Sequence, residues 1–227
     1  MLQGLSAKLA AAKDILQTEG AVSLLRRGFD FSRRSLFQHG SYYLYEHSLE
    51  ERNEADFMPR IHDFVFKIIS RNEEADELAA SIGHDFRHCF INARRTLDKG
   101  AIAFCIFVDG RIAHIGWVAL TEEAKQKIDC HPYKVEFANK IACTGGTETV
   151  PEYRGKGLMV YGYFKRFQYL REKGLIASRN AVAVDNIASQ KAHAKFGPKK
   201  YATARYLKLL GWEDWRESPT EPVDHTG

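Results

Sequence analysis

Two glycines between basic residues mark the stretch of the chain best suited to bind an anion. Arg154, Gly155, Lys156 and Gly157 follow directly after Pro151 and two further residues. Because glycine has no Cβ atom, the backbone there can adopt unusual angles and bring its NH groups close to a ligand. A helix beginning at this point presents unpaired NH donors and partial positive charge, which suit a phosphate or pyrophosphate. The stretch therefore predicts a phosphate-binding turn, with two full positive charges added by its basic side chains.

This turn does not follow the two most familiar phosphate-binding motifs. A P-loop would need a Gly-Lys-Ser/Thr ending, which does not follow the glycines. The dinucleotide fingerprint would need a third glycine, and Met159 and Val160 stand in its neighbourhood.

The stretch resembles motif A of the GNAT superfamily of acyl-CoA N-acyltransferases, Val-x-Pro-x-x-Arg/Gln-Gly-x-Gly-Ile/Leu-Gly/Ala. The matching residues are Pro151, Arg154, Gly155, Gly157 and Leu158. Thr149 stands at the usual valine and Met159 at the final small residue, so the last turn around a pyrophosphate is expected to be tighter. Binding by backbone NH groups is expected to survive both changes.

A second block further along the chain resembles motif B of the same superfamily, Asn-x-x-Ala/Ser-x-x-Leu-Tyr-x-x-Leu-Gly-Phe. Asn186, Ser189 and Gly197 align with it. His193 stands at the usual tyrosine and Pro198 at the usual phenylalanine. Both motifs occur in the order and at the separation that the superfamily has.

The resemblance implies acetyl-CoA, or another acyl-CoA, as co-substrate, held between a strand ending at Val150 and a strand at 176–184. If these strands diverge, some of their backbone NH and CO groups are left unpaired. The amides of pantetheine could then hydrogen-bond to them. An NH near Thr147 is expected to hold the thioester oxygen as it becomes negative. The expected donor contacts are Thr147, Thr149, Val150, Arg154, Gly155, Lys156, Gly157, Leu158, Met159, Asn186 and Ser189.

Proton transfer is expected to involve His193 and Glu148. His193 takes the position of a tyrosine that commonly protonates the CoA thiolate, so it is our candidate general acid, with a packing role as the alternative. Positions 181–184, where many members keep a glutamate, contain none. Glu148 is the candidate base, although strand alternation points it away from the neighbouring threonines unless residues 145–146 form a bulge.

A metal site is not expected. His84, His88, Cys130 and His131 offer ligand atoms, but only the two histidines at 84 and 88 have helical spacing and no carboxylate supports them. The four cysteines include no Cys-x-x-Cys pair, which favours a reducing cytoplasm. Cys143 is interpreted as a buried, inert cysteine rather than an acyl-accepting thiol.

Composition excludes several classes of protein. A chain of 227 residues with 44% hydrophobic residues can bury the core of one domain with additions. Its 33 basic and 29 acidic residues are too balanced to indicate nucleic-acid binding. No apolar run reaches the length of a membrane span, and the first residues do not follow a signal-peptide pattern. Arginine pairs at 26–27 and 33–34 leave a membrane surface open as a partner, but packing of this helix on the domain is favoured.

The elements that must position these residues follow from periodicity and turn signals. In the first half we predict helices at 5–16 and 22–36, a strand at 64–69, helices at 72–82 (capped by Asn72) and 86–97, and a hairpin of 101–108 and 111–120. In the second half we predict extended chain at 133–150, a helix ending near 174, a strand at 175–184, a helix from 186 and one or two strands at 201–211.

The predicted fold class is α/β, with a GNAT-like, mixed but mostly antiparallel central sheet, helices on both faces and a splay between two central parallel strands. Residues 1–55 are assigned to a helical extension, 56–212 to a GNAT acyltransferase domain and 213–227 to a polar tail.

The predicted function is that of a cytoplasmic N-acetyltransferase that moves acetyl from acetyl-CoA to a primary amine by direct attack. The acceptor is expected to be a small molecule such as an amino sugar or an amino acid, and a homodimer is left open. The alternative is a non-catalytic acyl-CoA-binding or interaction module with the same fold.

Overall fold

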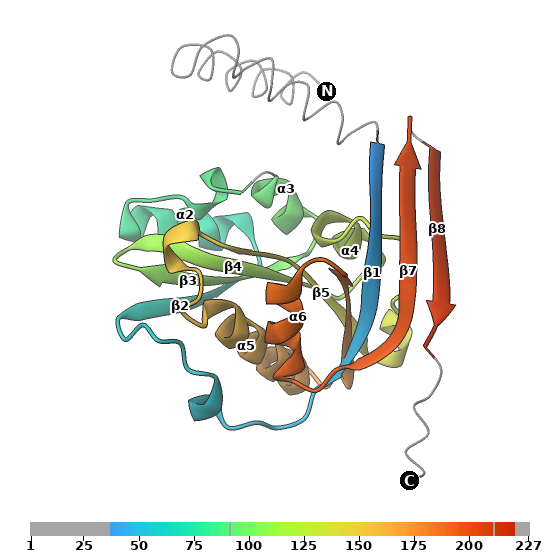
Figure 1. Ribbon diagram of the computed structural model, residues 1–227. Coiled ribbons are helices and arrows are strands. Elements are labelled where there is room, and N and C mark those ends of the chain that lie inside the picture. Colours follow the sequence, from blue (N-terminus) through green and yellow to red (C-terminus); the bar gives the residue numbers. More distant parts are fainter. Residues whose placement is uncertain (1–36, 91, 211, 221–227) are drawn as a thin grey trace. The chain divides into compact units, whose positions relative to one another are not determined.

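The computed structural model describes residues 37–90, 92–210 and 212–220 (Figure 1). They fall into two compact units. The larger unit contains residues 42–204 and 217–220, and the smaller contains residues 37–41 and the described part of 205–216. All candidate site residues belong to the larger unit.

Eight described strands pair in the order β2-β3-β4-β5-β6-β1-β7-β8. The strands are β1 (Phe37–Ser48), β2 (Phe64–Ile69), β3 (Ile102–Val108), β4 (Arg111–Ala119), β5 (Ile141–Thr149), β6 (Ala177–Ala183), β7 (Lys199–Leu209) and β8 (Trp212–Pro219). The helices are α2 (Asn72–Ile82), α3 (Ala93–Asp98), α4 (Glu122–Ile128), α5 (Leu158–Glu172) and α6 (Ile187–Ala194). The sheet is mostly antiparallel, and β5 and β6 are its parallel pair.

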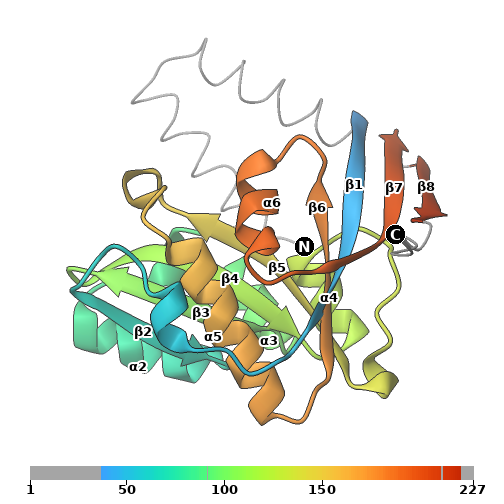
Figure 2. The same ribbon diagram turned by 60° about the horizontal axis from the view of Figure 1, so that its bottom comes forward.

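Helices cover both faces of the sheet. Figures 1 and 2 show α5 and α6 on one face and α2, α3 and α4 on the other. The predicted fold class is therefore confirmed, including the two central parallel strands.

The hairpin of β3 and β4 forms as its turn sequence predicts. Asp109 and Gly110 have φ angles of 50° and 71°, the left-handed pair that a right-twisted two-residue hairpin requires. Both strands are almost entirely buried. Helix α5 packs on both of them.

The core on the α5 side is largely aromatic. Phe57 stacks on Phe164 of α5 and on Phe196, with ring centroids 5.2 and 4.9 Å apart. Leu158 and Leu170, at the two ends of α5, are 1% and 0% exposed. Each fully buried side chain of this size contributes about 1.5–3 kcal/mol, so both ends of α5 are firmly anchored.

Residues 37–48 correct the predicted helical extension. They form strand β1, whose residues 42–48 pair antiparallel with residues 177–183 of β6. Alternating aromatic side chains suit a pleated strand better than a helix, and this pairing partner is remote in sequence. Residues 1–36 lie outside the described residues, so the helices expected at 5–16 and 22–36 stay predictions, as does the domain division at residue 55.

The predicted C-terminal tail is also partly a strand. Residues up to Pro219 belong to β8, and Thr220 donates its NH to Tyr201 O at 3.1 Å. Pairing with β7 gives the backbone NH and CO groups of this segment hydrogen-bond partners in the sheet, whereas in a polar tail they would bond to water. Residues 221–227 lie outside the described part.

Two helical predictions need correction. Residues 86–97 are not one helix: a 3₁₀ turn at Phe86–His88 is followed, after left-handed Asn92 (φ 65°), by the short α3. Asn72 does not cap α2, because it is the first helical residue and its amide donates to Asp98 Oδ1 at 2.6 Å.

The sequence analysis did not predict helix α4. Thr121 caps it by accepting a hydrogen bond from Ala124 N at 3.2 Å, and Glu122 and Glu123 occupy its first turn. These signals were present in the sequence. The extended chain predicted at 133–150 becomes a strand only at Ile141.

In the described parts of the chain, no helix has the length and apolar character needed to cross a membrane.

Candidate functional site

The site begins where the two parallel strands separate. β5 and β6 pair only at Ile141–Ala177, Ala142–Ser178 and Cys143–Arg179. Beyond these pairs, Thr144 Oγ1 and Ser178 Oγ lie 3.0 Å apart and close the end of the ladder. Residues 144–149 of β5 and residues 180–183 of β6 therefore do not pair with each other.

A β-bulge in β5 lies just beyond this point, at residues 145–146, where the sequence analysis left a bulge open. Ile115 of β4 pairs with Glu148, whereas Trp117 pairs with Gly145, so β5 carries one extra residue. Gly146 has a φ of +54°, and a Cβ atom there would meet Trp117 Cδ1 at 2.7 Å. The bulge thus depends on glycine and leaves the backbone of residues 146–147 without a partner in the β4 register.

The glycine turn leads directly into α5. Gly155 and Gly157 have φ angles of 75° and 87°, and a Cβ at Gly155 would meet no atom within 4 Å. No described side chain caps α5, and its first NH to bond in the helix is that of Tyr161, to Gly157 O at 3.1 Å. The NH groups of residues 158–160 are therefore available to a ligand.

Residues 59–60 hold this turn from the opposite side. Arg60 N donates to Lys156 O at 2.8 Å, and Pro59 Cα would lie 3.3 Å from a Cβ at Gly157. Arg154 Nε donates to Thr149 O at 3.1 Å, which fixes the turn to the end of β5. The turn is thus preorganised rather than free to adapt.

A single cavity of about 1000 Å³ joins the glycine turn, the bulge and the separated strands. Its lining includes these predicted residues: Thr147, Glu148, Thr149, Arg154, Gly155, Gly157, Leu158, Met159, Asn186, Ser189 and His193. Val150 does not line this cavity, and its NH is paired with Ala113 O at 3.0 Å. The side chain of Lys156 is exposed, with Nζ 5.3 Å from the centroid of the Tyr153 ring.

The chain matches no protein-family model and no curated protein sequence. Among solved structures, it superposes on the GCN5-related glucosamine N-acetyltransferase region of a fungal multi-domain GH3 β-N-acetylglucosaminidase. That match has a TM-score of 0.50 and 16% identity, and covers 83% of this chain and 23% of the fungal chain. The chain has the GNAT fold.

Two further structures of this fold are similar at lower scores. A GNAT-family acetyltransferase from Colwellia psychrerythraea gives a TM-score of 0.49 with 17% identity over 77% of this chain and 57% of that one. A tandem GNAT protein of the clavulanic acid biosynthesis pathway gives 0.47 with 19% identity over 82% and 55%. This chain spans less than two thirds of the length of each of the three.

In this GNAT fold, His193 lies on α6 at the wall of the cavity and is 0% exposed. The Asn180 amide nitrogen lies 3.0 Å from His193 Nε2, and His193 Nδ1 lies 3.0 Å from His47 Nε2. Burial, with the nearby His47 and Arg166, holds the pKa of His193 well below its usual value. A neutral ring with a partner at each nitrogen is poorly placed to protonate a thiolate, so the acid role of His193 stays a prediction.

Glu148 projects to the sheet face opposite α5. Thr147 and Thr149 contact residues on the α5 side, namely Arg166 and His114, at 3.1 and 2.8 Å. Glu148, between them, is exposed, and its charge contributes to raising the pKa of Cys89, after burial and Asp85. The bulge precedes residue 147, so alternation is normal at 147–149 and Glu148 lies on the face that the sequence pattern indicated.

Asn186 and Ser189 meet at the start of α6. Asn186 Oδ1 accepts a hydrogen bond from Ser189 N at 3.1 Å and so caps the helix. Because this oxygen serves the cap, the Asn186 amide nitrogen is its remaining group for a ligand. Both residues line the cavity.

Sequence reasoning missed Arg166, a fully buried arginine on α5. It donates to Gly162 O at 3.1 Å and to Thr147 Oγ1 at 3.1 Å, and its guanidinium carbon lies 3.7 Å from the centroid of the Tyr163 ring. A Cβ at Gly116 would lie 2.7 Å from that carbon, so a glycine opposite α5 makes room for the charge. No periodicity distinguishes this arginine from a surface residue of an amphipathic helix.

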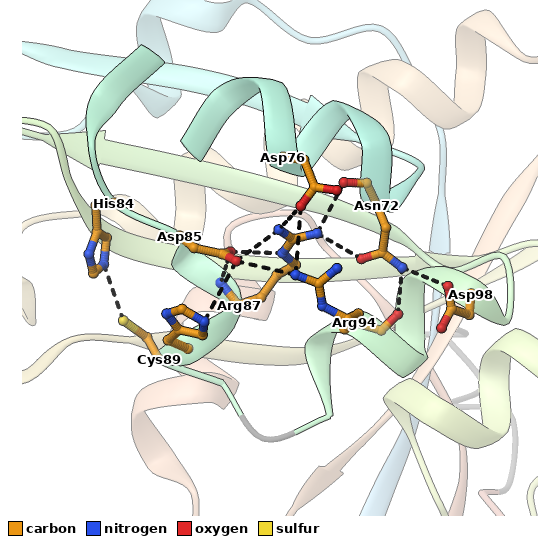
Figure 3. Close-up of polar contacts among 9 residues, drawn as sticks. Asn72, Asp76, His84, Asp85, Arg87, Cys89, Arg94 and Asp98 are labelled. Atoms are coloured by element: carbon orange, nitrogen blue, oxygen red, sulfur yellow. Dashed lines mark hydrogen bonds and ion pairs between the residues drawn. The ribbon is translucent and has the colours of Figure 1, made fainter. Parts of the chain in front are cut away.

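A separate polar cluster ties α2 to the 3₁₀ turn that follows it (Figure 3). Arg87, whose side chain is 2% exposed, donates to Asp85 at 2.7 Å and to Asn72 Oδ1 at 3.0 Å, and pairs with Asp76. The Arg87 guanidinium holds the pKa of Asp85 below its usual value. These contacts give the guanidinium of Arg87 its hydrogen-bond partners within the cluster, which indicates a structural role.

The histidines considered as metal ligands have different partners. His84 Nε2 lies 3.5 Å from Cys89 Sγ (Figure 3). His88 Nε2 lies 3.8 Å from Asp85 Oδ2. His131 lies beside α4 and is hydrogen-bonded to Asp129. In residues 37–90, 92–210 and 212–220, no three ligand-type side chains are grouped so that they could hold a metal ion.

Proposed function

We propose that this chain is an acyl-CoA-dependent N-acyltransferase, and specifically an N-acetyltransferase that uses acetyl-CoA and a primary amine. The observation that carries the proposal is one cavity that connects an uncapped helix N-terminus with the gap between two parallel strands. An acyl-CoA has a pyrophosphate, a chain of amides and a thioester, and each part has a suitable group along this cavity.

The pyrophosphate would bind at the start of α5. The NH groups of residues 158–160, the open backbone at Gly155 and the charge of Arg154 form the anion-binding part. The amides of pantetheine would pair with the backbone groups that β5 and β6 leave unpaired beyond Cys143 and Arg179.

The thioester would lie at the bulge. An NH of residues 146–147 can then hold the carbonyl oxygen as attack makes it negative, and Arg166 places a fixed positive charge behind Thr147. Holding the amine and the thioester together supplies a large part of the rate in a direct transfer.

For proton transfer, the candidates are two residues that line the cavity, Glu148 and His193. Glu148 is a candidate base because it lines the cavity on the face opposite α5. His193 remains the candidate acid only if ligand binding changes its contacts with Asn180 and His47. The acceptor that we propose is a small amine such as an amino sugar or an amino acid, in a cytoplasmic setting.

The second candidate is a non-catalytic acyl-CoA-binding module. It is favoured by the buried, neutral state of His193 and by the lack of a glutamate at 181–184. It predicts tight acyl-CoA binding without release of CoA in the presence of amines.

Calorimetric titration with acetyl-CoA tests the donor site. The variant Arg154→Glu, Gly157→Asp should weaken binding at least about 100-fold, or about 2.7 kcal/mol, because it places two negative charges at the pyrophosphate position. The matched control is Lys173→Glu, Gly174→Asp at the other end of α5, where Gly174 also has positive φ and no atom lies within 4 Å of a Cβ. Absence of acetyl-CoA binding by the folded wild type would contradict the proposal.

A further inference from the structure

His131 and Asp129 form a hydrogen-bonded pair on the wall of the cavity next to α4. His131 Nδ1 lies 2.6 Å from Asp129 Oδ1, and the side chains are 15% and 9% exposed. Both residues line the same cavity as the bulge and the glycine turn. Asp129 directly follows α4, which lies on the face of the sheet opposite α5 (Figure 2).

Three contacts fix His131. Its backbone NH donates to Asp129 Oδ1 at 3.0 Å, its ring bonds to the same oxygen, and its carbonyl accepts from Lys125 Nζ at 2.7 Å. Lys125 is itself buried, with Nζ 4.4 Å from the centroid of the Tyr133 ring. Tyr133 OH donates to Asp129 Oδ2 at 2.9 Å, which fixes the carboxylate in turn. The buried Lys125 thus holds the backbone of His131, and the Asp129 carboxylate holds its ring.

The carboxylate determines which ring nitrogen is basic. An ionised carboxylate only accepts hydrogen bonds, so the Asp129 contact requires a proton on His131 Nδ1. The lone pair of the neutral ring is then on Nε2.

The pair also lies next to the proposed thioester position. A Cβ at Gly145 would lie 3.3 Å from Ile128 O and 3.6 Å from Asp129 Cβ. Gly145 is two residues beyond the last β5–β6 pair and directly before the bulge residues. The missing side chains at 145–146 therefore allow the end of α4 to approach the point where the strands separate.

We propose that His131 is the general base of the transfer, with Asp129 and Lys125 as its positioning residues. This inference rests on the proposed function and adds to it the entry of the acceptor from the α4 face. His131 Nε2 takes one proton from the incoming ammonium group, and the freed amine forms a bond to the thioester carbon. The C–S bond breaks, the CoA thiolate takes the second proton from the nitrogen, and His131 returns its proton to water.

Other titratable groups face His131 from several elements. Tyr42 of β1 packs on the ring with centroids 4.2 Å apart, and Glu148 of β5 lines the same cavity. Lys125 and Asp129 contact it directly. Glu148 is the rival base, and its acidic side chain would in either case attract a cationic amine.

The first test is the tautomer of His131, measured by nitrogen NMR of histidine-labelled protein without ligand. At pH 8, Nδ1 should carry the proton and Nε2 should not, and Asp129→Asn should remove this preference. A proton on Nε2 in the wild type would overturn the proposal, whatever reaction the protein catalyses.

The second test is acetyl transfer by His131→Gln, measured as CoA release with glucosamine, L-lysine, spermidine and hydroxylamine. At pH 7 we expect kcat/KM for the transferred cationic amine to fall roughly 10²-fold or more. The loss should be less than about tenfold with hydroxylamine, which is largely unprotonated at neutral pH, and should shrink as the pH rises. Acetyl-CoA affinity should stay within about threefold, and His62→Gln, an exposed histidine, is the control.

Equal losses with both kinds of amine, at all pH values, would overturn the role of base. Retention of the pH dependence in His131→Gln together with its loss in Glu148→Gln would assign the base to Glu148 instead. Wild type that binds acetyl-CoA but releases no CoA with any of these amines would overturn the proposed function, while the NMR result would still decide the tautomer.

Discussion

At the scale of single residues, the most costly feature is the buried charge of Arg166. Its partners are carbonyl oxygens, the Thr147 hydroxyl and the face of Tyr163, and among the described residues no carboxylate pairs with it. Burial lowers its pKa, as expected for a cation removed from water. Proteins seldom bury a cation without an anion, so under the proposed transfer we expect this charge to stabilise the thioester oxygen as it becomes negative.

Arg166→Met should therefore lower kcat roughly 10²-fold while leaving acetyl-CoA affinity within about threefold. The fixed charge would stabilise only the oxyanion, which forms after the donor has bound. Steady-state CoA release and calorimetry measure the two quantities.

Arg171→Met on the same helix is the control, because Arg171 bonds to Glu50 O at the surface. An unchanged kcat in Arg166→Met would show that the charge serves packing alone.

At the scale of elements, the bulge in β5 connects the sheet to the proposed site of acyl transfer. It places Thr147 on the α5 side and Gly145 against the end of α4, so one irregular strand contacts both walls of the cavity. Gly146 permits this geometry because it has positive φ and because a Cβ atom there would clash with Trp117.

Gly146→Ala should lower the free energy of unfolding by about 2–4 kcal/mol, since it combines backbone strain with a clash against Trp117. Gly174→Ala, also at positive φ but with no atom within 4 Å, should cost only about 1 kcal/mol. Urea unfolding of both variants gives the difference. Equal losses would mean that Trp117 moves aside and that the bulge does not depend on this contact.

Local signals explain how much could be predicted. The glycine turn, the bulge and the helix from residue 186 are each encoded within a few neighbouring residues, and all three form. The strand β1 was missed because its partner β6 is remote in sequence, and the contact between His47 and His193 spans 146 residues. The pairing of Asp129 with His131 was overlooked because helix α4, which presents it, was not predicted.

At the scale of the whole molecule, three buried histidines link folding to pH. Burial lowers the pKa of His47 and of His114 to about 3, with Arg166 as a further cause, and lowers that of His193. In the unfolded chain their pKa is about 6.5. Between these values the unfolded state binds more protons, so the stability present above about pH 6.5 is lost as the pH falls towards 3.

The free energy of unfolding should therefore decrease between pH 6.5 and 4, by up to about 1.4 kcal/mol per pH unit for each buried histidine. Urea unfolding across this range measures the slope. His114→Gln should make the slope shallower, whereas His62→Gln, at an exposed position, should leave it unchanged. A slope that is the same in all three proteins would contradict neutral burial of His114.

The short ladder between β5 and β6 has a mechanical consequence. Three residue pairs hydrogen-bond the strands β2–β5 to β6 and its neighbour β1, whereas β3 and β4 pair along most of their length. The sheet thus has a seam across its middle, where little backbone bonding resists shear or opening. A molecule with amides of its own that filled this seam would join the two halves as a missing strand would, so that binding and the cohesion of the sheet become one property.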